Sequence, residues 1–329
     1  MIKHVLVTGG AGFVGSVLIP KLLKNNYRVT CIDTFWYGDA FSDIQPHPQL
    51  KLVRSDIRDS EVLKAELQNI DAVIHLACIS NDSSFELDPT LGKSINHDAT
   101  IQLIDLAKVK GVGRFIYASS SSVYGVKNEA EVTEQLTLEP LTDYSKYKAL
   151  SENYLLSRQS DDFTTLVLRP ATVCGYSPRL RLDLTVNILT IQALVNKKIT
   201  VFGGNQLRPN IHIEDMTDLY IETLRYRNHL IAGRVYNVGY ENYSILSLAQ
   251  MVKQTLKDPE VKIFRQPAKD LRSYKISSRK ILRDLGFKPR RTVEDAILDL
   301  KKAYENGKIP DALTNKRYYN IRTMKHLFG

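Results

Sequence analysis

The stretch that decides the fold is TGGAGFVG, at residues 8–15. It directly follows a short apolar run, HVLVT at 4–8, and it opens an apolar pattern with helical spacing at 14–24. Its glycines permit a tight turn and let the backbone approach a pyrophosphate, while the helix start offers free N–H groups and a favourable dipole. A glycine triplet alone also suits a plain strand-to-helix turn, so the neighbouring segments have to decide between the two.

The second apolar run, RVTCID at 28–33, ends in a carboxylate, Asp33. At that point of a strand–helix–strand unit a carboxylate accepts hydrogen bonds from ribose hydroxyls and repels a 2′-phosphate, which favours NAD over NADP. A turn aspartate is the structural alternative. Asp56 ends the third run and is expected at the adenine, although it alternatively caps the next helix. The cofactor-binding residues predicted from these strand ends are Gly9, Gly12, Phe13, Val14, Gly15, Asp33, Asp56, Ile57, Leu76 and Ala77.

Short apolar runs alternate with helical segments through the first half of the chain, which predicts an α/β fold with a doubly wound parallel, Rossmann-like sheet. After about residue 175 the segments become shorter and more mixed. We therefore expect an NAD-binding domain at 1–175, with its last strands contributed by parts of 200–240, and a smaller α/β substrate lobe at 176–329. The expected strands are 4–8, 28–33, 51–56, 72–78, 114–120 and 164–170, and the expected helices are 14–24, 60–68, 90–110, 143–158 and 184–196.

Bulk properties exclude several classes of protein. The 329 residues are 43% hydrophobic and 25% charged, which suits a large globular core and argues against disorder. The net charge of +9 is spread along the chain without interleaved aromatic residues, so no nucleic acid partner is expected. Three cysteines without metal-ligand spacing indicate reduced thiols, no metal site and a cytoplasmic protein. No apolar run is long enough to span a membrane.

The segment YSKYK at 144–148 places Tyr144 and Lys148 on one face of a helix. A tyrosine titrates near 10, but a neighbouring ammonium favours the phenolate and suits it to general acid–base work. Lys148 is also placed to hold the nicotinamide ribose, so both residues count among the cofactor contacts. The pattern alone is common in helices. A serine run, ASSSSVYG at 118–125, makes it specific, because Ser120 at a strand's carboxyl end brings a hydroxyl toward Tyr144.

Together these segments resemble the extended short-chain dehydrogenase/reductase family, and later segments resemble its nucleotide-sugar epimerase/dehydratase branch. The resemblance covers nearly the whole chain. It implies NAD on the large lobe, a nucleotide diphosphate sugar on the small lobe, Tyr144 as acid/base assisted by Ser120 and Lys148, and a homodimer. The residues that carry it are TGGAGFVG, Asp33, HLA at 75–77, SSSSVYG, YSKYK, LRPATVCG at 168–175, VFGG…RPNIHIED at 201–215, YNVG at 236–239 and LGFKP at 285–289.

The branch of the family follows from two serines. Where 4,6-dehydratases carry an Asp-Glu pair, this chain has Ser121 and Ser122, and two hydroxyls do not replace a carboxyl acid and a carboxylate base. Cys78 and Cys174 are more typical of core or cavity-lining residues than of epimerisation bases. We therefore expect hydride chemistry at one carbon, C4, most simply a 4-epimerase. A 4-dehydrogenase or ketoreductase acting on a deoxyhexose or heptose remains the alternative, and a non-catalytic NAD-binding module is disfavoured by intact Ser120, Tyr144 and Lys148.

Substrate contacts are expected mainly from the small lobe. Arg208 occupies the family position of an arginine on the diphosphate, and a planar guanidinium suits that task. Surface charges are the alternative for each arginine, including Arg181. Thr172, Pro209 and the loop segment Asn81-Asp82-Ser83 depart from the residues common in the family, which favours a modified sugar. The predicted substrate-binding residues are Ser80, Asn81, Ser121, Arg179, Asn187, Arg208 and Arg272.

Overall fold

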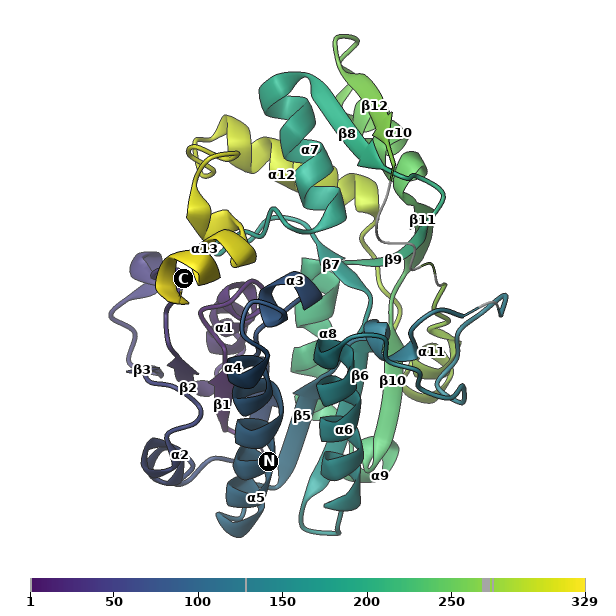
Figure 1. Ribbon diagram of the computed structural model, residues 1–329. Coiled ribbons are helices and arrows are strands. Elements are labelled where there is room, and N and C mark those ends of the chain that lie inside the picture. The colour runs from purple at the N-terminus through teal and green to yellow at the C-terminus, as the bar shows by residue number, and fades with distance from the viewer. Residues whose placement is uncertain (1, 128, 268–272, 274, 329) are drawn as a thin grey trace.

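The computed structural model describes residues 2–127, 129–267, 273 and 275–328. Its centre is a seven-stranded sheet with the strand order β10-β6-β5-β4-β1-β2-β3 (Figure 1), and every neighbouring pair in it is parallel. This confirms the predicted Rossmann-like sheet. Its strands are β1 (His4–Thr8), β2 (Arg28–Asp33), β3 (Leu50–Arg54), β4 (Ala72–His75), β5 (Arg114–Ala118), β6 (Thr164–Pro170) and β10 (Arg234–Val238).

Helices cover both faces of the sheet, which explains why its strands are apolar throughout. Neighbouring residues of β1 point to opposite faces: Val5 and Val7 belong to one buried cluster, and Leu6 belongs to another. The first face is covered by α1 (Gly15–Lys24) and α8 (Ile213–Arg225), which pack together. The second face is covered by α2 (Ser60–Glu66), α5 (Ala99–Val109) and α6 (Asp143–Ser157).

The helix expected at 90–110 is interrupted. It consists of α4 (Pro89–Lys93), a π-helical turn η2 (Ser94–Asp98) and α5. The wide turn carries Asn96, which is 1% exposed. Its side-chain amide pairs with both backbone groups of Ile79, at 2.8 Å and 2.9 Å, and so fixes the loop after β4. Such turns are frequent at functional sites.

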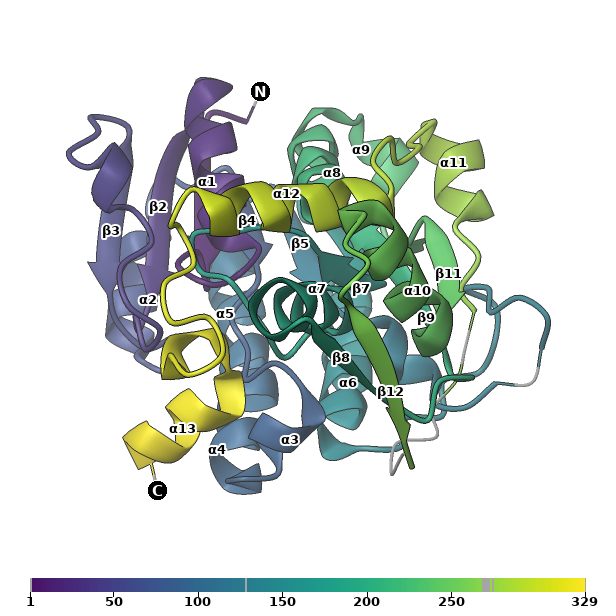
Figure 2. The same cartoon turned by 90° about the horizontal axis from the view of Figure 1, so that it is seen from above.

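The small lobe lies above the carboxyl ends of the sheet strands (Figures 1 and 2). It contains a three-stranded sheet, β11-β9-β7, and a parallel pair, β12-β8, covered by helices. Its elements are β7 (Thr172–Cys174), α7 (Thr185–Asn196), β8 (Lys198–Phe202), β9 (Leu207–His212), β11 (Glu241–Ser244), α10 (Ile245–Leu256), β12 (Lys262–Gln266) and α12 (Val293–Glu305).

The remaining elements are short connections and the C-terminal helix. After α12 the chain returns to the large lobe, where α13 packs against α3. Within the part of the chain that the structure describes, none of the helices combines the length and apolar character needed to cross a bilayer. These elements are η1 (Ser42–Ile44), α3 (Asp82–Phe85), η3 (Ser121–Tyr124), α9 (Asn228–Ile231), α11 (Arg279–Leu285), η4 (Lys316–Tyr318) and α13 (Asn320–Phe328).

Candidate active site

A cavity of about 840 Å³ lies between the sheet's carboxyl edge and the small lobe. It brings together residues from the glycine turn, the ends of β2 and β4, the serine run and the Tyr144–Lys148 segment. Asn187 does not line it, and Arg272 lies outside the described residues. The predicted residues that line the cavity are Gly9, Gly12, Phe13, Val14, Gly15, Asp33, Asp56, Ile57, Leu76, Ala77, Ser80, Asn81, Ser120, Ser121, Tyr144, Lys148, Arg179 and Arg208.

The glycine turn fits a dinucleotide because side chains there would collide with the backbone. Gly9 has a φ of +71°, and a Cβ on it would lie 2.6 Å from the Cα of Ala77. A Cβ on Gly12 would lie 3.1 Å from the carbonyl oxygen of Gly9. The turn therefore sits close to the end of β4 and leaves the N-terminus of α1 open toward the cavity, which suits a pyrophosphate.

Asp33 is held in a fixed orientation at the end of β2. One carboxylate oxygen accepts the backbone N–H of Ala11 at 2.9 Å, and the other accepts that of Phe35 at 2.7 Å. Burial raises the pKa of Asp33, while these two N–H groups act in the opposite direction. The carboxylate thus links the glycine turn to β2 and faces the region expected for the adenosine ribose.

Asp56 lines the same end of the cavity. It forms an ion pair with Arg58 at 2.8 Å and accepts the backbone N–H of Arg58 at 2.9 Å. The cap of α2 is instead Asp59, which accepts the N–H groups of Glu61 and Val62. The alternative interpretation of Asp56 as the cap of that helix is therefore wrong.

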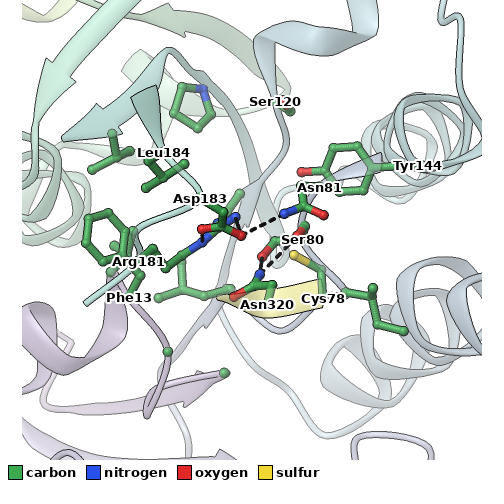
Figure 3. Close-up of a pocket in the computed structure, with 18 of the residues that line it drawn as sticks. Phe13, Cys78, Ser80, Asn81, Ser120, Tyr144, Arg181, Asp183, Leu184 and Asn320 are labelled. Carbon is green, nitrogen blue, oxygen red and sulfur yellow. Dashed lines mark hydrogen bonds and ion pairs between the residues drawn. The ribbon is translucent and has the colours of Figure 1, made fainter. Parts of the chain in front are cut away.

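Tyr144 and Lys148 project from the first turns of α6. A reciprocal capping box between Thr142 and Ser145 fixes the start of this helix. The ammonium of Lys148 is buried and donates to the carbonyl of Ala118 at 2.8 Å. Burial raises the pKa of the Tyr144 phenol and neighbouring Cys78 adds to this, whereas Lys148 lowers it. The helix therefore presents the protonated phenol of Tyr144 to the cavity (Figure 3), and Lys148 lines the same cavity.

The serine cluster follows β5 directly. The hydroxyl of Ser120 accepts the backbone N–H of Ser122 at 3.1 Å and the hydroxyl of Ser122 at 2.9 Å. Ser120, Ser121 and Ser122 all line the cavity. Ser120 keeps its own hydroxyl proton available for a ligand oxygen.

A buried ion pair supports this cluster from below. Ser119 donates to Glu152 of α6, and the carboxylate of Glu152 pairs with Arg169 of β6 at 2.6 Å. Glu152 is 0% exposed and Arg169 is 5% exposed. Arg169 also donates to the hydroxyl of Tyr124 at 2.8 Å. These contacts tie α6, and so Tyr144, to the ends of β5 and β6.

The two lobes meet beside Tyr144. Asp183 forms a two-pronged ion pair with Arg181, at 2.9 Å and 3.1 Å. The side-chain amide of Asn81 donates to the same carboxylate at 2.8 Å (Figure 3). Asn81 has a φ of +90°, a strained backbone of the kind that collects at functional sites. Burial alone would raise the pKa of Asp183, but Arg181 brings it below its ordinary value.

Asn187 has a structural role in place of the predicted substrate contact. It is 0% exposed and lies on α7, behind the cavity wall. Its amide oxygen accepts the N–H of Gly175 at 3.0 Å, and its amide nitrogen donates to the carbonyl of Arg181 at 2.9 Å. It therefore fixes the loop that carries Arg179 and Arg181, which line the cavity.

Sequence reasoning missed several lining residues because distant segments supply them. Asp183 could have been predicted from the sequence, because a carboxylate two residues after Arg181 suggests an ion pair. The others carry no local pattern and enter the site only through tertiary packing. They are Trp36, Tyr37, Gln206 and Asn320.

Comparison with known proteins agrees with this geometry. Residues 5–239 match the NAD dependent epimerase/dehydratase family. The chain is 28% identical over 301 residues to a putative UDP-glucose 4-epimerase of Methanocaldococcus jannaschii. This match covers 89% of this chain and 95% of the relative. It is 29% identical over 311 residues to a dTDP-glucose 4,6-dehydratase of Streptomyces griseus, covering 90% and 92%.

Solved structures give the same result. The UDP-glucuronic acid 4-epimerase of Bacillus cereus, in complex with UDP-glucuronic acid and NAD, has a TM-score of 0.83 and 28% identity, covering 92% of this chain and 99% of that one. DesIV, a dTDP-glucose 4,6-dehydratase of Streptomyces venezuelae with NAD bound, has a TM-score of 0.83 and 25% identity, covering 92% and 98%. The chain is thus an NAD-dependent enzyme that belongs to the NAD-dependent epimerase/dehydratase family, the nucleotide-sugar branch of the extended short-chain dehydrogenases/reductases.

Proposed function

We propose that this enzyme is a 4-epimerase of a nucleotide diphosphate sugar. The observation that carries the proposal is the pairing of a cavity-facing Tyr144 and Lys148 with hydroxyls, not carboxyls, at Ser121 and Ser122. This set of groups supports proton transfer at one sugar oxygen. It lacks the neighbouring acid and base with which a 4,6-dehydratase removes water.

In the proposed reaction Tyr144 takes the proton of the sugar's 4-hydroxyl and later returns it. NAD supplies the hydride acceptor when bound. Lys148 lowers the pKa of Tyr144 and so opposes the effect of burial. Ser120 donates a hydrogen bond to the reacting oxygen and keeps it aligned with the phenol. Rotation of the ketosugar before the hydride and the proton return would present the other face of C4 to the hydride, which gives the opposite configuration at C4.

The carboxylates of the cavity argue against dehydration. Four acidic residues line it among those that the structure describes, and two of them, Asp33 and Asp56, lie at the cofactor end. At the sugar end Asp183 is paired with Arg181, which lowers its pKa and makes it a poor acid. Asp82 accepts the hydroxyl of Thr142 at 2.5 Å.

The nucleotide is expected at the far end of the cavity, which belongs to the small lobe. Arg208, on β9, lines this end and is proposed to bind the sugar-linked diphosphate. Phe202 lines it as well and is 54% exposed, so its ring is available to a base. The B. cereus relative holds a UDP-sugar, which makes UDP-sugars the first substrates to test.

A homodimer is proposed through α5 and α6. These helices lie side by side on one face of the sheet (Figure 1), and they carry Val109 and Leu150, which are 80% and 42% exposed. Light scattering on the purified protein tests the proposal. A monomeric mass at micromolar concentration would contradict it.

The reaction is tested by incubating the enzyme with UDP- and dTDP-sugars in deuterated water. A 4-epimerase gives the C4 epimer, no net NADH absorbance and no deuterium on carbon, because hydride leaves and returns without exchanging with solvent. A 4,6-dehydratase must remove the C5 proton and therefore incorporates deuterium. Net NADH absorbance indicates a 4-dehydrogenase. Either of the last two results refutes the proposal.

A further inference from the structure

The C-terminal helix lies over the cofactor end of the cavity. Although α12 belongs to the small lobe, α13 returns to the large lobe and packs against α3 (Figure 2). The ring of Phe328 meets that of Trp36 edge-on, with centroids 5.0 Å apart. Trp36 follows β2 and lines the cavity. Phe328 of α13 is therefore in contact with the region expected to receive adenosine.

Asn320, the first residue of α13, joins three segments. It is 1% exposed and lines the cavity. Its amide nitrogen donates to the carbonyl of Ser80 at 3.1 Å and to the hydroxyl of Ser80 at 2.9 Å (Figure 3). Its amide oxygen accepts the guanidinium of Arg179 at 2.5 Å. One side chain thus connects the loop after β4, the small-lobe loop and the C-terminus.

Arg179 is placed at the glycine turn. Its backbone N–H donates to the hydroxyl of Ser16 on α1 at 3.4 Å, and nearby Ser177 donates to the carbonyl of Phe13 at 2.7 Å. Its guanidinium lies 3.7 Å from the centre of the Tyr37 ring. This region contains the N-terminus of α1, where a dinucleotide's diphosphate is expected.

The guanidinium of Arg179 has bonding capacity left over. It is 4% exposed, and its Nε has no hydrogen-bond partner among the described residues. Burial lowers the pKa of Arg179 to about 10, so it stays charged at neutral pH. Arg179 lines the cavity, and a buried cation in a cavity wall is suited to an anionic ligand.

We propose that Arg179 binds the diphosphate of NAD, not that of the nucleotide sugar, and that Asn320 and Phe328 form a C-terminal latch that retains the cofactor. Asn320 positions Arg179, and Phe328 holds the loop after β2. The reason for retention rests on the proposed function, because an epimerase must return the hydride to the ketosugar that gave it.

The test measures how fast bound NAD exchanges with excess labelled NAD in the holoenzyme. We expect Arg179→Ala and Asn320→Ala to speed exchange about tenfold, the change expected for the loss of a charge-assisted hydrogen bond. Phe328→Ala should also speed exchange. The matched control is Leu327→Ala, which removes a neighbouring exposed side chain of the same helix and should leave exchange unchanged.

A second measurement separates the two diphosphates. Calorimetric titration with UDP and dTDP should give unchanged affinities in Arg179→Ala. Loss of nucleoside diphosphate affinity with unaltered NAD exchange would overturn the assignment and return Arg179 to the substrate. Equal weakening of both ligands together with a lower Tm would also overturn it, because that result indicates a purely structural role.

The double variant Arg179→Ala/Asn320→Ala tests whether Asn320 acts through Arg179. If it does, the second substitution adds nothing to the first. Multiplicative effects would refute the positioning role. All these measurements are made without a nucleotide sugar, so their outcome does not depend on the proposed epimerase reaction.

Discussion

A substitution of His75 by glutamine tests the buried polar contacts beneath the catalytic residues. His75 ends β4 and is 1% exposed. Its two ring nitrogens make hydrogen bonds with the hydroxyls of Thr8 at 2.6 Å and Thr100 at 2.9 Å, and its ring stacks on Tyr117. Burial lowers the pKa of His75 to about 3, and the charge of Lys148 acts in the same direction. The ring is therefore neutral in the folded protein.

The size of the expected change in stability follows from the linkage between proton binding and folding. The unfolded chain binds a proton at His75 with the ordinary pKa of 6.5, whereas the folded protein does not until about pH 3. The stability that comes from excluding this proton is present above pH 6.5 and is lost as the pH falls toward 3. One proton corresponds to about 1.4 kcal/mol per pH unit. Between about pH 7.5 and about pH 4.5 the loss is therefore ~2.6 kcal/mol.

Urea unfolding of the wild type and His75→Gln at both pH values measures this difference. Glutamine can still donate to one threonine hydroxyl and accept from the other, but it does not titrate. The stability advantage of the wild type over the variant should shrink by ~2.6 kcal/mol on acidification. Parallel losses in the two proteins would refute the reasoning, because they would show that His75 binds its proton equally in both states.

Three further substitutions give separate tests. Tyr144→Phe should lower kcat by about 10²–10⁴-fold while the amount of bound NAD stays at the wild-type level; full turnover would rule out the acid/base role. Glu152→Gln leaves the buried Arg169 without its charge partner and should cost ~3–5 kcal/mol in urea unfolding, so an unchanged midpoint would show that the pair is not needed. Gly9→Ala forces a Cβ to within 2.6 Å of Ala77 and should reduce NAD occupancy, measured as dinucleotide released on denaturation; wild-type occupancy would contradict the tight turn.

Much of the large lobe could be predicted because its determinants are local. The runs at 4–8, 28–33 and 164–170 coincide with β1, β2 and β6. The helix expected at 90–110 was only partly correct, because its π turn depends on Asn96 bonding to Ile79, a contact that periodicity does not reveal. A buried strand can be recognised from its apolar composition, whereas an irregular turn depends on a contact with a residue far away in the sequence.

The same division applies to the active site. The glycine turn and Tyr-x-x-x-Lys are defined by spacing along one element, and the structure places both on the cavity wall. Asn187 was predicted as a substrate contact because it follows Arg179 and Arg181 on the next helix, whereas packing turns its amide toward Gly175. Asn320 lies 240 residues from Ser80, and no sequence pattern indicates that the two meet.

Burial of Tyr144 determines at which stage of the proposed reaction its side chain can act as a base. Because burial disfavours the phenolate, the side chain is a stable phenol whenever the cavity holds no additional positive charge. Lys148 opposes this only partly. An oxidised nicotinamide would add the missing positive charge, so the phenol becomes a base only with oxidised cofactor and readily keeps its proton once hydride has neutralised the ring. We infer that the burial of Tyr144 couples the proton to the hydride, and that a more hydrated tyrosine would lose this coupling because its phenolate would form more readily without oxidised cofactor.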